Sequence, residues 1–198
     1  MSSTVLAPPP IESPWTLPSR GRVGMFCLIA AESAIFTIFV VAYVFYIGKS
    51  ISGPTPRQVL ELPIFNTACL LFSSLTIHFA IRALRKGNRG AFTGLWFFTF
   101  LLGAVFLVGT GREWHHLIYD KGLTIQTNLF GTTYYSLVGL HAFHVIVGLT
   151  GILIILAFAL AGRVKVEHAD RVDVFSLYWH FVDVVWVVVF TVVYVIGR

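Results

Sequence analysis

The sequence predicts an all-α membrane protein, a polytopic bundle of five transmembrane helices. Of its 198 residues, 57% are hydrophobic and only 12% are charged, whereas a soluble domain typically carries about 25% charged residues. The mean hydropathy of +0.82 agrees with this class, because a water-facing surface needs a polar shell that the composition does not supply. Lipid is therefore the expected solvent around most of the chain.

Five apolar runs are long enough to cross a hydrocarbon layer of about 30 Å. They lie at about 23–47, 63–81, 91–109, 129–160 and 172–196. The fourth run is too long for one upright crossing and too short for two, so we expect one long, tilted helix. The predicted organisation is a membrane domain over residues 23–198 after a flexible cytoplasmic tail, residues 1–22, in which no cleavable signal peptide is visible.

The formal charge of +5 predicts an orientation in the membrane and not a nucleic-acid surface, because the basic residues stand between apolar runs. Nine lysines and arginines fall on the side of the N-terminal tail and five on the opposite side. Positive residues concentrate in cytoplasmic loops. The N-terminus is therefore expected in the cytoplasm and the C-terminus outside.

Ionisable side chains inside the spans each cost about 2.5 to 3.5 kcal/mol on insertion into the membrane, so each is expected to have a structural or functional role. The residues that we expect to form a buried polar network are Glu32, His141, His144, His180 and Asp183. The two histidines of the fourth span are three residues apart, as are His180 and Asp183 on the fifth, so each pair shares a helix face that could point at Glu32. Burial favours a protonated Glu32 and a histidine partner favours an ionised one, so both protonation states stay open.

Two functions are open for this network. Three histidines and two carboxylates suit iron, copper or zinc. The alternative is a hydrogen-bonded network that ties helices together, with Asp183 accepting from one histidine. No span holds the Glu-x-x-His pair of di-iron bundles, so we favour the network and expect neither metal ligands nor catalytic residues in this chain.

Tryptophans and arginines near span ends are typical of the membrane interface. The residues expected to anchor the chain to lipid or to its interface are Trp96, Trp114, Trp179, Trp186, Arg82 and Arg85. His78 lies beside the two arginines and is interpreted as an interfacial histidine without a role.

Several motifs resemble one known family. WHFVDVVW, residues 179–186, looks like the signature of the last helix of cytochrome oxidase subunit III, and FGTTYYSLVGLHAFHVIVG, residues 130–148, is similar to the family pattern that contains two histidines. GMFCLIAAES matches the helix that carries the family's buried glutamate, here Glu32. NTACLLFSSLT, residues 66–76, resembles a further family motif, and Glu113 falls on a loop acid.

The resemblance covers residues 21–198 and departs from the family at two positions. Ala142 stands where the family usually has glycine, and Thr110 stands where many cytochrome c oxidases have glutamine. The five spans imply a short bacterial form that lacks the first two helices of longer members, located in the bacterial plasma membrane.

The resemblance implies an accessory, non-redox subunit of a proton-pumping haem-copper oxidase in aerobic respiration. Haem and copper would then belong to partner subunits, with subunit I in direct contact and subunit II in the same complex. The chain itself would stabilise subunit I, bind phospholipid in a cleft between helices and support proton uptake.

Cytochrome c is the expected electron donor. A quinol oxidase is the alternative, because EWHHLI, residues 113–118, and FTVVY, residues 190–194, also resemble quinol oxidase forms. A relative associated with nitric oxide reductases, a stand-alone metal-dependent membrane enzyme and a transporter are further alternatives.

Overall fold

The fold, given by a computed structural model that describes residues 19–198, consists of helices joined by loops, with no strand in this part of the chain. Its elements are α1 (Arg20–Tyr46), α2 (Pro56–Val59), α3 (Ile64–Arg85), α4 (Arg89–Tyr119), α5 (Leu129–Leu160), η1 (Val166–His168), α6 (Ala169–Phe190) and the π-helical η2 (Thr191–Ile196). Five helices, with η1, α6 and η2 taken as one, are long and apolar enough to cross a membrane. The predicted all-α membrane fold is confirmed.

The helix limits correct the sequence prediction in two places. Helix α4 continues to Tyr119, ten residues beyond the predicted span, so Glu113 lies in a helix and not in a loop. Helix α1 begins at Arg20, inside the predicted tail, and residues 1–18 of that tail lie outside the described residues. Helix α5 is one unbroken helix of 32 residues, as expected, and its length of about 48 Å exceeds the hydrocarbon layer.

Local sequence signals set the beginnings of three long helices. The side chains of Ser19, Asn88 and Asn128 accept hydrogen bonds from backbone N–H groups in the first turns of α1, α4 and α5. These caps satisfy donors that a helix start would otherwise leave unpaired. The turns after α3 and α5 contain Gly87 and Gly162 with φ of +78° and +69°, a left-handed conformation that glycine adopts without steric cost.

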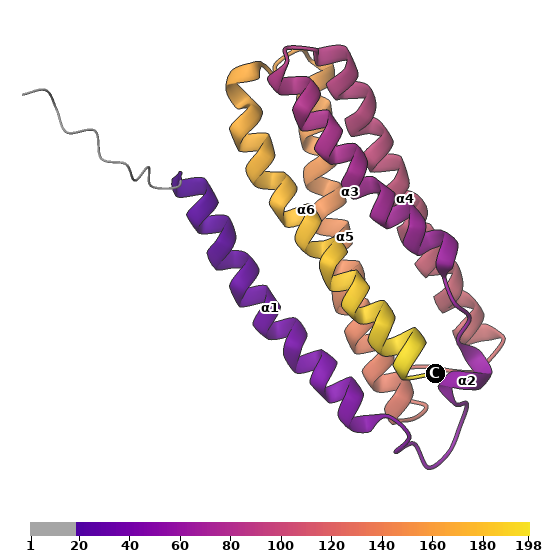
Figure 1. The fold of residues 1–198 in the computed structure, drawn as a ribbon. Coiled ribbons are helices and arrows are strands. Elements are labelled where there is room, and N and C mark those ends of the chain that lie inside the picture. The colour runs from indigo at the N-terminus through magenta and orange to yellow at the C-terminus, as the bar shows by residue number, and fades with distance from the viewer. Residues whose placement is uncertain (1–18) are drawn as a thin grey trace, which may run out of the picture.

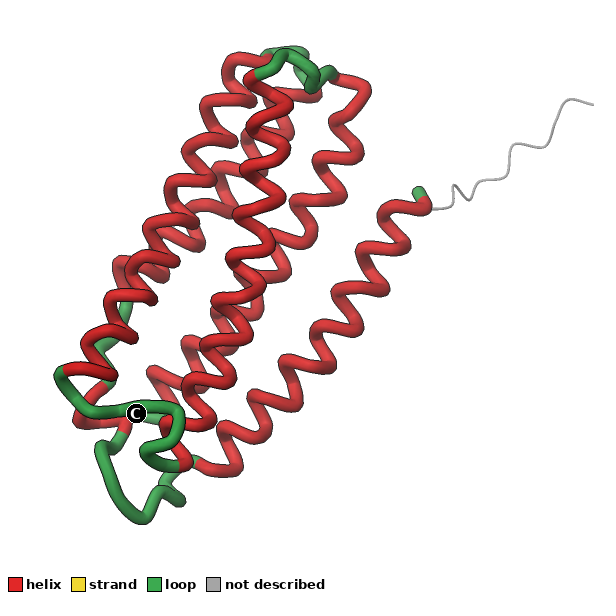
Figure 2. The backbone as a smooth tube through the Cα atoms, turned by 180° about the vertical axis from the view of Figure 1, so that it is seen from behind, coloured by secondary structure: helices red, strands yellow, loops and turns green. Residues whose placement is uncertain are grey.

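Four of the long helices form a bundle, and α1 lies beside it. Helix α4 packs against α3 and α5, while α6 packs against the same two helices and completes the bundle (Figure 1). Helix α1 contacts α5 and α6, and the view from behind shows it set apart from the rest (Figure 2). Only Phe36 and Tyr43 of α1 are buried. Helix α1 therefore packs along the bundle while burying few of its side chains completely.

Large aromatic side chains fill the centre of the bundle. Trp96 of α4 and Trp179 of α6 are fully buried, and Trp186 is 1% exposed. Gly103 of α4 faces this centre, since a Cβ there would lie 2.8 Å from Leu149 Cδ2 and 2.9 Å from Trp179 Cη2. The close packing of α4 against α5 and α6 therefore requires glycine at this position.

A pair of substitutions on α4 tests this packing. Gly103→Ala is expected to lower the free energy of unfolding by about 1 to 3 kcal/mol, because the added methyl group overpacks the core. A methyl group added at Gly94, on the same helix, would meet no atom of another helix within 4 Å, so Gly94→Ala should leave stability unchanged or raise it. Thermal unfolding in detergent measures both variants, and equal melting temperatures would contradict the packing described here.

Candidate functional site

Glu32 of α1 and His144 of α5 form a pair across the helix interface. His144 Nε2 lies 3.1 Å from Glu32 Oε2. The histidine side chain is 7% exposed and the glutamate 23%, and the ring of Phe36 covers the histidine at 4.9 Å between centroids. This is the one part of the expected network in which a histidine faces Glu32.

The hydrogen bond of the second ring nitrogen of His144 shows where the protons of the pair lie. Nδ1 lies 2.8 Å from the backbone carbonyl oxygen of Leu140, and a carbonyl only accepts, so Nδ1 carries a proton. One proton then lies between Nε2 and the carboxylate, whether Glu32 or His144 holds it. The pair is therefore a proton-sharing contact that also fixes α1 to the bundle.

His180 and Asp183 are joined through Ser74 of α3. The Ser74 hydroxyl donates to Asp183 Oδ2 and lies 2.8 Å from His180 Nδ1. Asp183 is buried, and its Oδ1 has no hydrogen-bond partner. The expectation that Asp183 accepts directly from a histidine is therefore corrected, because a serine hydroxyl stands between the two side chains.

Further α3 hydroxyls receive the indole N–H groups of α6. Trp179 Nε1 donates to Ser73 Oγ at 2.8 Å, and Trp186 Nε1 donates to Thr67 Oγ1 at 3.1 Å. These hydroxyls were not among the residues expected from the sequence. Thr67 and Ser74, the serine of the preceding cluster, are seven residues apart, which places them on one helix face. This spacing was the signal in the sequence for a face of α3 that carries hydroxyl groups.

The burial of three tryptophans does not fit the expected lipid anchoring. Trp96, Trp179 and Trp186 lie in the core, and Trp96 Nε1 donates to the carbonyl oxygen of Ile152 at 2.9 Å. Trp114 is partly buried against Tyr135. Interior hydrogen bonds, not the membrane interface, hold the first three side chains.

His141 is separate from both polar groups. It is fully buried, and neither ring nitrogen has a hydrogen-bond partner. Its ring lies 4.9 Å from Trp186 and 5.8 Å from Phe106 between centroids. The predicted network therefore divides into the Glu32–His144 pair, the Ser74–His180–Asp183 cluster and an isolated histidine.

The division also bears on metal binding. Among residues 19–198, no three side chains of histidine, cysteine, aspartate or glutamate come together in a group that could hold a metal ion. The two histidine pairs do not both point at Glu32, because His180 bonds to Ser74 on the α3 side of α6.

An ionic cluster joins three helices at the end of the bundle where α1 and α6 begin, which we call the basic end. Asp173 of α6 receives Arg22 of α1 at 2.5 Å and Arg85 of α3 at 3.1 Å. Arg85 is thus an ion-pair partner although its side chain is 48% exposed, and Arg82 is exposed as well. The charges are partly exposed, so they orient the helix ends and add little stability.

A second polar cluster lies at the opposite end. Glu113 Oε1 accepts from Tyr194 at 2.8 Å and from Tyr134 at 3.2 Å. This arrangement ties α4 and α5 to the π-helical η2. Glu113 therefore has a structural environment that the sequence-based assignment to a loop did not foresee.

Comparison with known proteins identifies the family. The sequence pattern of the family described as "Cytochrome c oxidase subunit III" matches residues 19–198. The chain belongs to this family. The matched residues are the same residues that the structure describes. They include the Glu32–His144 pair, the Ser74–His180–Asp183 cluster and the ion pairs at the basic end.

Members of the family from both oxidase classes are similar to this chain. Cytochrome c oxidase subunit 3 of Alkalihalophilus pseudofirmus is 36% identical, over 92% of this chain and 90% of the relative. Cytochrome bo(3) ubiquinol oxidase subunit 3 of Pseudomonas aeruginosa is 34% identical, over 88% and 84%. Probable quinol oxidase subunit 3 of Staphylococcus saprophyticus is 31% identical, over 89% of each chain. Membership of this family makes the chain a subunit III in a membrane-bound respiratory oxidase complex.

A double-mutant cycle tests the pairing of α1 with α5. Glu32→Ala and His144→Ala are each expected to destabilise the bundle by about 1 to 3 kcal/mol, because each leaves a buried partner unpaired. The double variant should be less unstable than the sum, with a coupling of at least about 0.5 kcal/mol. Thermal unfolding of the four proteins in one detergent gives the values.

The control cycle pairs Glu32→Ala with Ser73→Ala, a serine that bonds to Trp179 and not to α1. Those two effects should add. Additivity in the Glu32 and His144 cycle as well would show that the two side chains do not interact.

Proposed function

We propose that this chain is the accessory, non-redox subunit III of a proton-pumping haem-copper terminal oxidase. The observation that carries the proposal is the engagement of its intramembrane polar side chains with one another. Glu32 pairs with His144, and Ser74 joins His180 to Asp183. These contacts connect helices, so their role is to maintain the bundle while catalysis takes place in partner subunits.

Haem and copper are proposed to reside in those partners, with subunit I in direct contact with this chain and subunit II in the same complex. The chain would stabilise subunit I and support its proton uptake. The proton shared by Glu32 and His144 is the feature of this chain that fits such a role, because it lies inside a span where water is scarce.

Phospholipid is proposed to bind at the basic end. A cavity of about 450 Å³ lies there between the end of α5 and the beginning of α6, lined by Arg163, His168 and Arg171 and by apolar side chains that include Ile155 and Phe158. Two guanidinium groups suit a phosphate, and the apolar wall suits the beginning of an acyl chain.

The proposed location is a bacterial plasma membrane, with the basic end in the cytoplasm. The excess of lysine and arginine on that side, nine against five, supports this orientation. The N-terminus would then be cytoplasmic and the C-terminus external.

Cytochrome c is the proposed electron donor, and quinol is the second candidate. The names of the relatives support both, since a cytochrome c oxidase subunit and two quinol oxidase subunits match at comparable identity. Thr110, where many cytochrome c oxidases have glutamine, is buried and donates to the Phe106 carbonyl oxygen.

Co-purification through a tag on this chain tests the proposal. Mild-detergent extraction should yield a haem oxidase spectrum and a large multi-helix partner by mass spectrometry, and a subunit II with a dinuclear copper site would assign cytochrome c. A chain that came out alone, colourless and stable would contradict the proposal. Stoichiometric iron or copper in the chain alone would favour a metal-dependent enzyme, and substrate-coupled flux in liposomes would favour a transporter.

Replacement of the shared acid gives a more specific expectation. Glu32→Gln keeps a hydrogen-bonding side chain beside His144 but removes the exchangeable carboxyl proton. The purified oxidase should retain its haem content, while proton uptake slows or activity decays faster during turnover. A pH-indicator dye and oxygen consumption measure the two effects, with Thr37→Val of α1 as the control, and unchanged uptake and lifetime would oppose a role for Glu32.

A further inference from the structure

A cavity of about 390 Å³ lies at the end of the bundle opposite the basic end. There α1 and η2 end and α5 begins, close to α2 and the C-terminus (Figure 1). Helix α1 has 27 residues and is therefore about 40 Å long, which exceeds the hydrocarbon layer of about 30 Å. The cavity beside its last turn therefore lies at the level of the lipid headgroups.

The side chains that line this cavity include two arginines and no carboxylate. Arg57 of α2 and Arg198 make no ion pair within residues 19–198. Ser50 Oγ accepts a hydrogen bond from the Phe130 N–H, which leaves the hydroxyl proton free to donate. Positive charge and free donors without an acidic side chain suit an anion. Arg57 carries most of this argument, since a carboxylate at the end of the chain would offset the charge of Arg198.

Tyr43 of α1 places a buried polar atom at this cavity. Its side chain lines the cavity and is 2% exposed, yet its hydroxyl group has no hydrogen-bond partner within residues 19–198. The hydroxyl oxygen lies against Gly197, another lining residue, because a Cβ on Gly197 would be 2.6 Å from it. A buried hydroxyl without a partner is unfavourable, so an occupant with an acceptor atom is preferred over an acyl chain alone.

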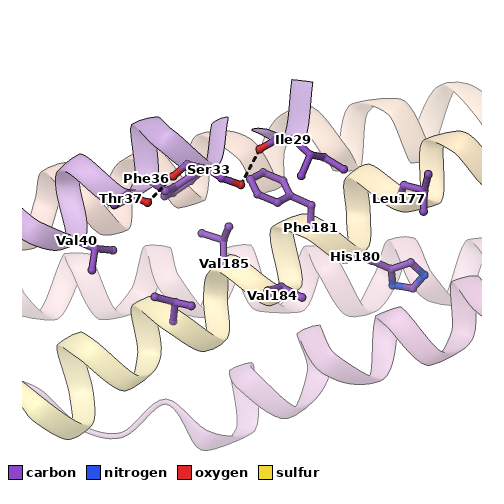
Figure 3. Close-up of a pocket in the computed structure, with 11 residues that line it drawn as sticks. Ile29, Ser33, Phe36, Thr37, Val40, Leu177, His180, Phe181, Val184 and Val185 are labelled. Carbon is purple, nitrogen blue, oxygen red and sulfur yellow. Dashed lines mark hydrogen bonds between the residues drawn. The ribbon is translucent and has the colours of Figure 1, made fainter. Parts of the chain in front are cut away.

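The larger cleft of about 520 Å³ between α1 and α6 has a different lining (Figure 3). Most of its side chains are apolar, and the hydroxyl groups of Ser33 and Thr37 each donate to a carbonyl oxygen of α1 at 2.7 Å. His180 bonds to Ser74 on the α3 side of α6. This cleft shares no residue with the smaller cavity and offers no guanidinium group to an anion.

We propose that the cavity beside the end of α1 binds the headgroup of an anionic phospholipid of the phosphatidylglycerol type, with phosphate oxygens accepting hydrogen bonds from Arg57 and Tyr43. Ile47, Phe130 and Ile196 also line the cavity and suit the glycerol ester and the beginning of an acyl chain. A headgroup without an amine fits best, because no carboxylate side chain is present to pair with an ammonium group. The site shares no residue with the lipid site proposed at the basic end and does not depend on the oxidase function.

Photolabelling of the full chain, with the subunits that co-purify with it, tests this site. The protein is placed in phosphatidylcholine nanodiscs that contain a small share of phosphatidylglycerol with a photoreactive headgroup, irradiated, and mapped by mass spectrometry. Adducts are expected on residues 43–57 and 196–198. An excess of unlabelled phosphatidylglycerol should suppress them, whereas equal amounts of phosphatidylethanolamine or inorganic phosphate should not.

Three variants make the result decisive. Arg57→Gln should reduce the labelling about tenfold, the effect of losing one charge-assisted hydrogen bond, and Tyr43→Phe about fivefold. Lys49→Gln is the matched control and should leave labelling unchanged, because Lys49 Nζ lies 3.4 Å from the centroid of the Phe45 ring and does not line the cavity. Since the Tyr43 hydroxyl bonds to no other group in residues 19–198, Tyr43→Phe should not lower the melting temperature in lipid-free detergent.

Labelling undiminished in both Arg57→Gln and Tyr43→Phe would overturn the proposal. An equal loss in Lys49→Gln would also overturn it, because it would show a general attraction between basic residues and an anionic membrane. Suppression of the adducts by inorganic phosphate would overturn the lipid assignment in favour of a free anion. Loss of the oxidase partners in co-purification bears on the proposed function alone.

Discussion

The fold depends on one constraint, which is that polar side chains inside a hydrocarbon layer find hydrogen-bond partners mainly within the protein, because water is scarce there. The seam between α3 and α6 meets this constraint most clearly. Trp179 and Trp186 donate to α3 hydroxyls, and Ser74 joins His180 to Asp183. Apolar contact alone gives little specificity between helices in lipid, so these hydrogen bonds set the register of the two helices.

The rest of the arrangement follows from the position of α6. Its other faces pack against α5 and α1, and at the basic end Asp173 receives arginines from α1 and α3. Helix α1, which buries few residues, is held in mid-membrane by the pair of Glu32 with His144. A cleft of about 520 Å³ lies between α1 and α6.

Four of the five residues expected in the polar network make side-chain hydrogen bonds, whereas His141 makes none. The sequence predicted the class and the number of spans, because composition and span length are set by the bilayer. It did not predict how the network divides. Residues three apart share a helix face, but which neighbour that face meets depends on helix rotation, and this separated His180 from Glu32. The tryptophans were misplaced for a related reason, since position along a span does not reveal whether a side chain turns inward.

The end of α4 and the role of the α3 hydroxyl groups were also not predictable from the sequence. Charged residues such as Arg112 and Glu113 ended the apolar run, yet α4 continues past them, because the two tyrosines supply partners for the carboxylate. Ser73 and Ser74 carried little signal in a span that is otherwise apolar. Their significance depends on side chains more than 100 positions away in the sequence.

The central claim is that this chain maintains an oxidase whose chemistry lies in its partners. Oxygen consumption by the purified complex, measured before and after selective removal of this subunit, tests that claim most directly. We expect haem and copper content and the initial rate to persist, while activity decays faster during turnover. Complete loss of the initial rate, with haem and copper content unchanged, would contradict the claim and place an essential step in this chain.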